Sequence, residues 1–511
     1  MADTASNPDF EKDTFVSWRE FLGSAYTPAL ALVCLSVWLH AADSLIVATM
    51  LPSIVAEISG VGLVGWSVSL YEITSVVAGA ASALLTMRHG LRTPMCFAAL
   101  AFGFGCFLSA VAPTMPTLLA GRVFQGLGGG GLVAMGFVAV GVIFPRRYTA
   151  RAMAAVSTFW GVSAFLGPLI GGFFVEFATW RWGFGFFGGQ AIILAIWIAL
   201  RPDQAPSKAR VSMVFPWKRL TLLCLAVLLI SYGGVEIEPA QTALCVLSGI
   251  GCLFLFLRLD QRAKDDRLLP LRPFDFRNPT GSALLMILSL SLATIAITAF
   301  GPLLVVVIHD ASALTAGYIV ACSSIGWTVM AVLVSGLPER LDRLVIMIGM
   351  ALVVASIAGF LYAVPNGPIW LIALFAAVEG GGFGMAWTFI LRRVTALSAP
   401  EEVQRISGAI PTVQRLGYAL GAAYIGIVAN AAGFATMETA TQAMGIARWI
   451  FAACLPFALI GLLSMVTLVR KKPFGETSAT PRSTLPSSGL PLSNDVVVRL
   501  SIRAGSSAGP W

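Results

Sequence analysis

Two glycine-rich sequences lie close together in this chain: GRVFQGLGGGG at 121–131 and GPLIGG at 167–172. Both belong to apolar segments, which are joined by the basic sequence PRRYTAR at 145–151. Glycine and proline are tolerated in membrane helices where neighbouring helices approach closely. Arg122, by contrast, costs about 2.5–3.5 kcal/mol at the centre of a membrane helix. The stretch therefore predicts closely packed transmembrane helices, and it requires a function or a structural partner for Arg122.

The composition of the whole chain is that of a polytopic membrane protein. Of its 511 residues, 57% are hydrophobic and 11% are charged, against about 25% charged in soluble domains, and the mean hydropathy is +0.85. The net charge of +8 does not indicate a nucleic-acid partner, because Lys and Arg lie in short loops between apolar runs. Residues 1–24 are polar and rich in acids, so no cleavable signal peptide is expected. The eight cysteines lie in apolar runs and are predicted to be core residues.

Hydrophobic runs divide the chain into fourteen predicted membrane spans. A transmembrane helix needs about 20 mostly apolar residues. The runs have the approximate limits 28–53, 64–86, 95–112, 116–143, 153–175, 182–200, 218–234, 240–257, 280–308, 313–336, 344–363, 367–390, 406–430 and 443–469. The seventh and eighth are short and are flanked by polar, basic segments at 201–217 and 258–279. Two sets of six spans around a central pair are typical of transporters built from repeats.

The basic residues predict the orientation of these spans. With the N-terminus in the cytoplasm, most of the 33 Lys and Arg residues fall in loops on the cytoplasmic side, as the positive-inside rule requires. Both termini of this multi-pass protein are then cytoplasmic, in a plasma or bacterial inner membrane. The predicted parts are a cytoplasmic N-terminal segment (1–27), a six-helix bundle (28–200), loops with two linker helices (201–279), a second six-helix bundle (280–469) and a disordered cytoplasmic tail (470–511). Arg122 and GPLIGG both fall toward the outer side.

These motifs resemble those of a known family. GRVFQGLGGG at 121–130 is similar to the fourth-span motif of the major facilitator superfamily, and GPLIGG is similar to the core of its fifth-span antiporter motif. DSLIVATMLP at 43–52 and WRW at 180–182 resemble sequences of the 14-span drug:proton antiporters within it. The resemblance implies an all-α fold of two six-helix bundles plus two linker helices. It also implies proton-coupled export of small amphipathic or cationic molecules by alternating access, by a monomer in the lipid bilayer.

The loop after the second span departs from the family pattern. It keeps the basic and glycine positions of the family motif, Arg88, Gly90 and Arg92. Met87, however, stands where the family has an acid. That acid is implied to latch the two halves in one conformational state, so the resemblance predicts an altered latch here. The corresponding loop of the second half has an acid at Glu339, followed by Arg340.

Three acids inside predicted spans are candidates for a proton carrier: Asp43, Glu72 and Glu379. Burial favours the neutral form of a carboxyl group, whereas a cation within about 4–6 Å favours the charged form. Arg122 is the candidate partner, because a proton on the acid would loosen an ion pair between them. Each of the four residues has a structural alternative, in which the acid is simply hydrogen-bonded and Arg122 binds backbone carbonyl groups. Residue spacing does not choose among the acids.

The remaining candidates concern a substrate cavity and gating. The cavity candidates are aromatic or polar residues within the spans: Trp38, Trp66, Tyr71, Gln125, Trp160, Trp387, Arg415 and Tyr418. Membrane-belt or core packing is the commoner role of Trp and Tyr. The candidates for gating and helix packing are Arg88, Gly90, Arg92, Gly167, Pro168, Gly171, Gly172, Glu339 and Arg340. For each glycine, a purely structural role explains the sequence as well as gating does.

Two other functions are compatible with the sequence. A transporter of an anionic metabolite would use Arg122 and Arg415 as substrate ligands. A membrane sensor of the same fold would bind its ligand without transporting it. ATP-driven pumping and enzymatic catalysis are not expected, because the chain contains no GxxxxGK[ST] phosphate loop and only three histidines. No cofactor or metal is expected either.

Overall fold

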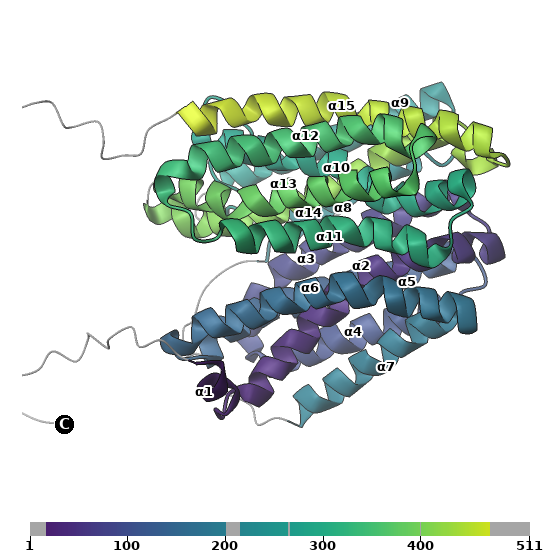
Figure 1. Ribbon diagram of the computed structural model, residues 1–511. Helices are drawn as coiled ribbons and strands as arrows, with labels where there is room; N and C mark the ends of the chain where they lie inside the picture. Colours follow the sequence, from purple (N-terminus) through teal and green to yellow (C-terminus); the bar gives the residue numbers. More distant parts are fainter. Residues whose placement is uncertain (1–16, 201–214, 264–265, 399, 471–511) are drawn as a thin grey trace, which may run out of the picture. The chain divides into compact units, whose positions relative to one another are not determined.

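The computed structural model describes residues 17–200, 215–263, 266–398 and 400–470, which form helices and the turns between them (Figure 1). The helices are α1 (Trp18–Leu22), α2 (Thr27–Ile58), α3 (Val64–His89), α4 (Arg92–Ala110), α5 (Met115–Ile143), α6 (Arg146–Phe177), α7 (Trp180–Ala199), α8 (Trp217–Tyr232), α9 (Pro239–Arg262), α10 (Pro279–His309), α11 (Ala313–Val334), α12 (Asp342–Asn366), α13 (Ile369–Ala396), α14 (Pro400–Ala431) and α15 (Ala440–Arg470). Single 3-10 turns occur at η1 (Val61–Leu63), η3 (Glu339–Leu341) and η4 (Phe434–Thr436). Most of the predicted loop at 201–217 and of the predicted tail at 470–511 lies outside the described residues.

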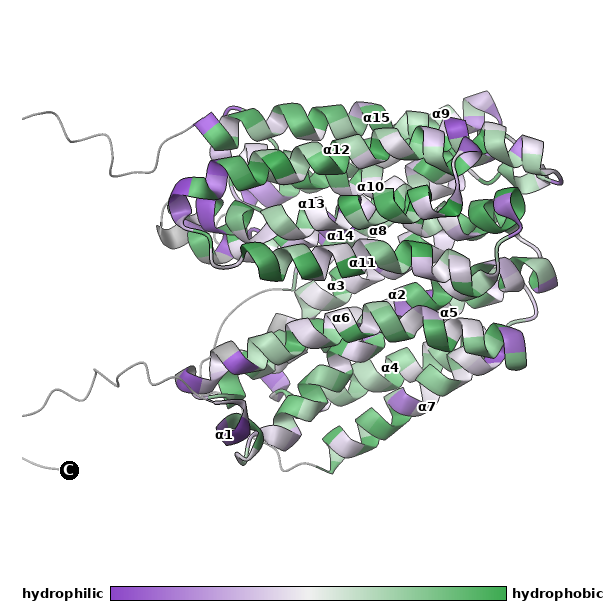
Figure 2. Cartoon of the chain, in the orientation of Figure 1, coloured by the Kyte–Doolittle hydropathy of each residue, from purple (hydrophilic) through white to green (hydrophobic). Residues whose placement is uncertain are grey.

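The predicted spans coincide with the helices α2 to α15, but two of these helices are not typical spans. In the described residues, twelve helices are long and apolar enough to cross a membrane, and Figure 2 shows that apolar residues dominate along them. Helix α8 has 16 residues, which corresponds to about 24 Å of helix against a hydrocarbon core of about 30 Å. Helix α14 has 32 residues but carries Glu402, Arg405 and Arg415. The fourteen-span prediction is therefore supported for twelve helices and stays a prediction for α8 and α14.

The helices α2–α7 and the helices α10–α15 pack by one common pattern. In each set of six, the first helix packs on the fifth, the second and third pack on the fourth, and the third packs on the sixth. For example, α2 contacts α6 as α10 contacts α14, and α4 contacts α7 as α12 contacts α15. The two sets of six helices, called the first and the second half below, thus share one packing pattern, which is typical of transporters built from repeats.

The glycine run at 126–131 lets α5 pack closely on both α3 and α4. A Cβ atom at Gly126 would overlap the backbone of Tyr71 in α3. One at Gly128 would overlap the backbone of Phe102 in α4. Small residues allow membrane helices to approach in this way, because dispersion contacts between helices replace the hydrophobic driving force available in water. The close packing predicted from this sequence is present in the structure.

The two halves meet where α3 packs on α14 and where α11 packs on α6 and α2. We call the end of the helices that carries the turn after α2 the Gly60 end, and the end that carries the turn between α3 and α4 the Gly90 end. Toward the Gly60 end, the Asn430 side chain donates to the carbonyl oxygen of Gly62 at 2.8 Å. The Ser69 hydroxyl donates to the carbonyl oxygen of Ala419 at 3.0 Å. The structure therefore shows the halves in contact toward the Gly60 end.

Helices α8 and α9, the predicted linker helices, are joined by a buried ion pair. Helices α8 and α9 pack on each other, and α8 also contacts α3 and α14. Arg219 of α8 donates to the carboxylate of Asp260 in α9, with 2.7 Å between Nη1 and Oδ1. The same carboxylate accepts the backbone N–H groups of Leu268 and Leu269 at 2.9 and 3.0 Å. Asp260 therefore connects α8, α9 and the segment that leads toward the second half.

Replacing Asp260 by asparagine is expected to lower the free energy of unfolding by about 3 kcal/mol, because it leaves the buried Arg219 charge unpaired. Asp266→Asn is the matched control, since Arg219 donates to the backbone carbonyl oxygen of Asp266 and not to its side chain. The control should stay within about 0.5 kcal/mol of the wild type. Unfolding of the detergent-purified protein in denaturant measures both. Equal stability of the two variants would show that the pair does not hold the linker together.

Candidate functional site

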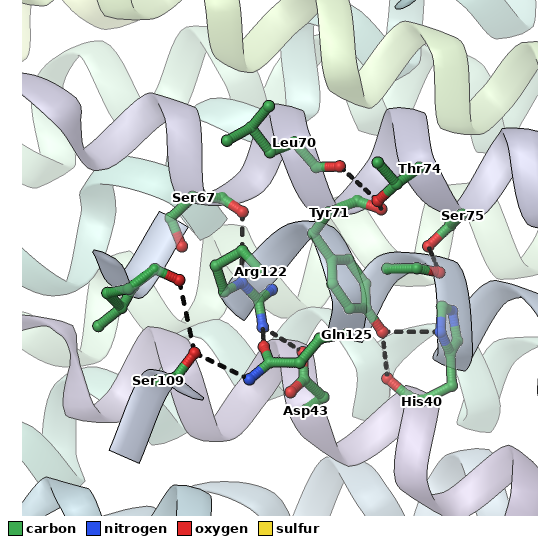
Figure 3. A network of polar contacts seen from close by, with 12 residues as sticks. His40, Asp43, Ser67, Leu70, Tyr71, Thr74, Ser75, Ser109, Arg122 and Gln125 are labelled. Carbon is green, nitrogen blue, oxygen red and sulfur yellow. Dashed lines mark hydrogen bonds and ion pairs between the residues drawn. The ribbon is translucent and has the colours of Figure 1, made fainter. Parts of the chain in front are cut away.

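A buried ion pair joins α2 and α5 inside the first half (Figure 3). The Nη1 atom of Arg122 lies 2.5 Å from Oδ2 of Asp43, and both side chains are 3% exposed. The same Nη1 atom lies 2.5 Å from Oε1 of Gln125, and Nε donates to the carbonyl oxygen of Ser67 at 3.3 Å. Gln125 in turn donates to the Ser109 hydroxyl at 3.1 Å. Four helices, α2, α3, α4 and α5, thus position the guanidinium.

The surroundings of this pair make it sensitive to a proton. The guanidinium carbon of Arg122 lies 4.2 Å from the centre of the Tyr71 ring, so an aromatic face covers it. Ion pairs in such a low-dielectric interior depend on both charges being present, because removing one leaves the other buried and uncompensated. A proton on Asp43 would remove the negative charge and leave the guanidinium with neutral partners only. Protonation of Asp43 would therefore break the ion pair.

A second charged pair crosses from the first half to the second. Nη1 of Arg415 in α14 lies 3.3 Å from Oε2 of Glu72 in α3, with 22% and 12% of the two side chains exposed. Nη2 of Arg415 lies 2.8 Å from Nε2 of His40 in α2. Arg415 therefore reaches out of its own half and contacts two helices of the other.

His40 connects the two pairs, although it was not among the sequence candidates. Its Nδ1 atom lies 2.7 Å from the hydroxyl of Tyr71, whose ring covers Arg122. Gly129 makes room for this contact, since a Cβ atom there would lie 2.9 Å from His40 Nδ1 and 3.0 Å from the Tyr71 hydroxyl. The sequence offers only one weak indication of a role for His40. Of the three histidines, it is the one in the middle of a predicted span.

Glu379, the third candidate acid, lies apart from both pairs. It belongs to α13 in the second half and is 3% exposed. Within the described residues, its Oε1 atom has no hydrogen-bond partner. Glu379 forms no ion pair within the described residues, and a buried charge without a partner is costly. The structure thus separates Glu379 from Arg122, with which Asp43 alone of the three acids forms an ion pair in the described residues.

The cavity candidates divide into two groups. Trp160 packs edge-on to the His40 ring, 5.9 Å between centroids, and is 39% exposed. Tyr71, Gln125 and Arg415 belong to the polar network around Arg122 and His40, against which Trp160 packs. The other candidates have different partners. Trp38 donates to Gln190 of α7, and Trp66 lines a small cavity beside α8. Trp387 packs on Trp327, and Tyr418 accepts a hydrogen bond from Gln414. Trp38 packs within the first half, and the cavity role of all these residues stays a prediction.

The GPLIGG segment packs on both halves at the contact surface between them. The Cβ position of Gly167 lies 2.9 Å from Cβ of Leu45, and that of Gly171 lies 3.1 Å from Cβ of Thr49, both in α2. The Cβ position of Gly172 lies 2.6 Å from Cδ1 of Leu314 in α11, which belongs to the second half. Pro168 lies inside α6 between these contacts.

The loop residues predicted to act in the latch differ in their exposure and in their contacts. Gly90 has φ +73°, a conformation that favours glycine, and ends α3. Arg92 donates to the carbonyl oxygen of Ala199, whereas Arg88 is exposed. Glu339 and Arg340 are exposed in η3. The side chain of Met87 lies outside the described residues.

Two acids that the sequence candidates omitted do form ion pairs. Asp342 pairs with Arg392 of α13, with 3.2 Å between Arg392 Nε and Oδ2. Glu57 at the end of α2 accepts from Trp180 at 2.6 Å and pairs with Arg181 at 2.9 Å. The second contact gives the WRW sequence a structural role at the Gly60 end. Within the described residues, no three His, Cys, Asp or Glu side chains are grouped as metal ligands.

Comparison with known proteins agrees with this architecture. The sequence model described as Major Facilitator Superfamily matches residues 33–421 and, in a second match, residues 283–506. The chain belongs to this superfamily. It is therefore a multi-pass integral membrane protein and a secondary transporter of small molecules, and it is not an enzyme. The resemblance to the superfamily is confirmed, whereas membership of its 14-span antiporter family stays a prediction.

Two relatives of this superfamily member are named for drug efflux or drug resistance. A Mycobacterium tuberculosis protein named as a multidrug-efflux transporter is 28% identical over 429 residues, which are 81% of this chain and 90% of the relative. A Yersinia pestis protein named as a multidrug resistance protein is 32% identical over 229 residues, 43% of this chain and 48% of the relative.

Solved structures show the same fold at low sequence identity. A bacterial homologue of the human lysosomal transporter Spinster, in an inward-facing and unoccupied conformation, has a TM-score of 0.62 and 14% identity, covering 88% of this chain and 97% of that one. The E. coli xylose transporter XylE, in a partially occluded inward-open conformation, has a TM-score of 0.56 and 14% identity, covering 88% and 100%.

Proposed function

We propose that this transporter exports small amphipathic or cationic molecules in exchange for protons, by alternating access between its two halves. The observation that carries the proposal is the buried Asp43–Arg122 pair, at 2.5 Å, beside the contact between the halves. Asp43 is the proposed proton carrier, and Arg122 is the group that senses its charge. The relative named as a multidrug-efflux transporter supports the direction of transport. Together with the relative named as a multidrug resistance protein, it supports the substrate class.

The two arginines favour this proposal over transport of an anionic metabolite. Arg122 faces Asp43 and Arg415 faces Glu72, so each guanidinium already has a carboxylate partner in this structure. An anionic substrate would have to displace a carboxylate from either arginine. A cationic substrate could instead be attracted by the carboxylate of Glu379, which forms no ion pair within the described residues.

The proposal predicts that Asp43→Asn removes transport driven by a pH gradient. Asparagine keeps the shape and one hydrogen-bond acceptor of aspartate but carries no exchangeable charge. In proteoliposomes with an imposed pH gradient, uptake of a fluorescent lipophilic cation should fall to the level of empty liposomes. Exchange of that cation at equal pH on both sides should persist, because it needs no net proton movement.

Glu176→Gln is the control, since this carboxylate is exposed on α6 of the same half. The control should transport like the wild type. Wild-type transport that survives collapse of the gradient would refute proton exchange. Gradient-driven transport by Asp43→Asn would instead refute Asp43 as the proton carrier.

A further inference from the structure

A single side-chain amide, that of Asn430, joins three parts of the chain at the Gly60 end. Asn430 is the last residue but one of α14 in the second half. Its Nδ2 atom donates to the carbonyl oxygen of Gly62 in the first half at 2.8 Å. It also donates to the carbonyl oxygen of Gly234, just after the end of α8, at 2.6 Å. The two amide hydrogens thus serve two different parts of the molecule.

The partners of this amide fix its orientation. Backbone carbonyl oxygens can only accept hydrogen bonds, so the NH2 group of Asn430, and not its oxygen, faces Gly62 and Gly234. A carboxylate in the same place would have no hydrogen to donate and would turn negative oxygen atoms toward two carbonyl oxygens. The arrangement therefore requires asparagine and excludes aspartate, although the two side chains have nearly the same shape.

Glycine residues bring the three parts close together around Asn430. The Cβ position of Gly65 in α3 lies 2.8 Å from the carbonyl oxygen of Ala422 in α14. That of Gly234 lies 2.9 Å from Cγ1 and 3.1 Å from the backbone nitrogen of Ile427, also in α14. Small residues permit helices to approach in this way. The backbones of α3, of α14 and of the turn after α8 therefore meet directly at this point.

The two contacts between the halves differ in their chemistry at this end. Between α6 and α11, the contact of Gly172 with Leu314 is apolar. Between α3 and α14, Asn430 and Ser69 donate hydrogen bonds across the contact, and α8 packs on both helices. A hydrogen bond is lost once its heavy atoms separate beyond about 3.5 Å. Separation of α3 from α14 must therefore break the bond to Gly62, whereas the bond from Asn430 to Gly234 can persist.

We propose that Asn430 is a positioning residue of the gate at the Gly60 end, and that the predicted linker helix α8 is part of this gate. With Asn430 bound to Gly62, the Gly60 end is closed and α8 is fixed against both halves. When this end opens, Asn430 releases Gly62 and retains Gly234, so α8 moves with α14. The inference rests on the alternating access proposed above, but it does not depend on which group carries the proton.

Hydrogen–deuterium exchange of the full-length, detergent-purified protein tests this gate. The peptide that covers residues 61–72 of η1 and α3 reports on the Gly60 end. Peptides 151–160 of α6 and 325–334 of α11 report on the Gly90 end, and peptide 95–110 of α4 reports on folding of the first half. The key variant is Asn430→Asp, which keeps the shape of the side chain and removes its hydrogen-bond donors.

Asn366→Asp is the matched control for this variant. Asn366 is the last residue of α12, and its hydrogen bonds to Tyr362 and Arg448 stay within the second half. An asparagine that joins no separate parts should be replaceable without effect on the gate. The control should therefore exchange like the wild type in all four peptides.

In Asn430→Asp we expect exchange in residues 61–72 to rise roughly tenfold, as for the loss of two ordinary hydrogen bonds. Exchange at the Gly90 end should not rise, because alternating access closes one end as the other opens. In proteoliposomes, exchange of the lipophilic cation at equal pH should fall several-fold, since it requires closure of the gate but no proton gradient. Faster exchange in all four peptides would indicate general destabilisation and would overturn the proposal, as would wild-type exchange in residues 61–72.

Gly234→Val tests the part assigned to α8, and it decides the matter even if Asn430→Asp fails to fold. A branched side chain at Gly234 meets Ile427 and displaces the Gly234 carbonyl group from Asn430. Exchange in residues 61–72 should therefore rise in this variant too. Gly251→Val on α9 is its control, because a Cβ atom at Gly251 meets no atom within 4 Å. Wild-type exchange in Gly234→Val would overturn the role of α8.

The outcome for this gate is separable from that for proton exchange. A protein that shows the expected changes in hydrogen exchange but transports without a pH gradient would retain the Asn430 gate and lose the antiport proposal. Gradient-driven transport at the wild-type rate by Asn430→Asp would retain proton exchange and overturn the gate.

Discussion

Arg122→Ala is expected to abolish gradient-driven transport and to lower the free energy of unfolding by about 3–5 kcal/mol, the usual cost of breaking a buried ion pair. Asp43 would be left buried without a cationic partner, since its only ion pair within the described residues is with Arg122. The variant would also lose the hydrogen bonds to Gln125 and to the Ser67 carbonyl. Denaturant unfolding in detergent and the proteoliposome assay measure the two effects separately.

A double variant separates stability from function at this pair. Asp43→Leu combined with Arg122→Met replaces both charges by apolar groups, which often restores or raises stability. We expect this variant to unfold more like the wild type but to remain inactive, because the proton site is gone. Transport by Arg122→Ala at the wild-type rate would contradict the coupling role. Recovery of transport in the double variant would contradict the proton-carrier role of Asp43.

Gly172→Leu is expected to stop transport while leaving each half folded. The Cβ position of Gly172 already lies 3.0 Å from Cβ of Leu314, so a branched side chain cannot fit between α6 and α11. Overpacking of this kind costs about 1–3 kcal/mol, and separation of the two halves at the Gly60 end would relieve it. The transporter should then be unable to close that end, and transport should fall to background.

Gly141→Leu is the matched control, because a Cβ atom at Gly141 of α5 meets no atom within 4 Å. It should transport like the wild type. Hydrogen exchange in the peptide that covers residues 61–72 should rise in Gly172→Leu and not in the control. Wild-type transport by Gly172→Leu would show that this α6–α11 contact does not need to close.

Much of the fold follows from the order of apolar and polar residues. Length and hydropathy placed the ends of the helices α2 to α15 to within about seven residues, since a membrane helix must satisfy its backbone internally. Hydropathy is less informative for α8, which is short, and for α14, which is polar, because neither has the length and composition of an ordinary span.

The site was only partly predictable, for a geometric reason. Asp43, Glu72 and Glu379 look alike in sequence, as acids inside apolar runs. A helix turns about 100° per residue, so the partner of each acid depends on helix rotations that hydropathy does not specify. In the structure, Asp43 faces Arg122, Glu72 faces Arg415 of the other half, and Glu379 faces neither.

His40 shows the same limit more sharply. A single histidine in an apolar run carries no motif, and its partner Arg415 lies 375 positions away. By itself, the sequence determined which segments become helices, that Arg122 is buried among them, and that glycines at 126–131 and 167–172 permit close packing. Only the tertiary structure decided which acid meets Arg122 and that His40 joins the halves. The physical reason is that composition controls burial in the membrane, whereas pairing requires atoms from distant helices to meet within about 3 Å.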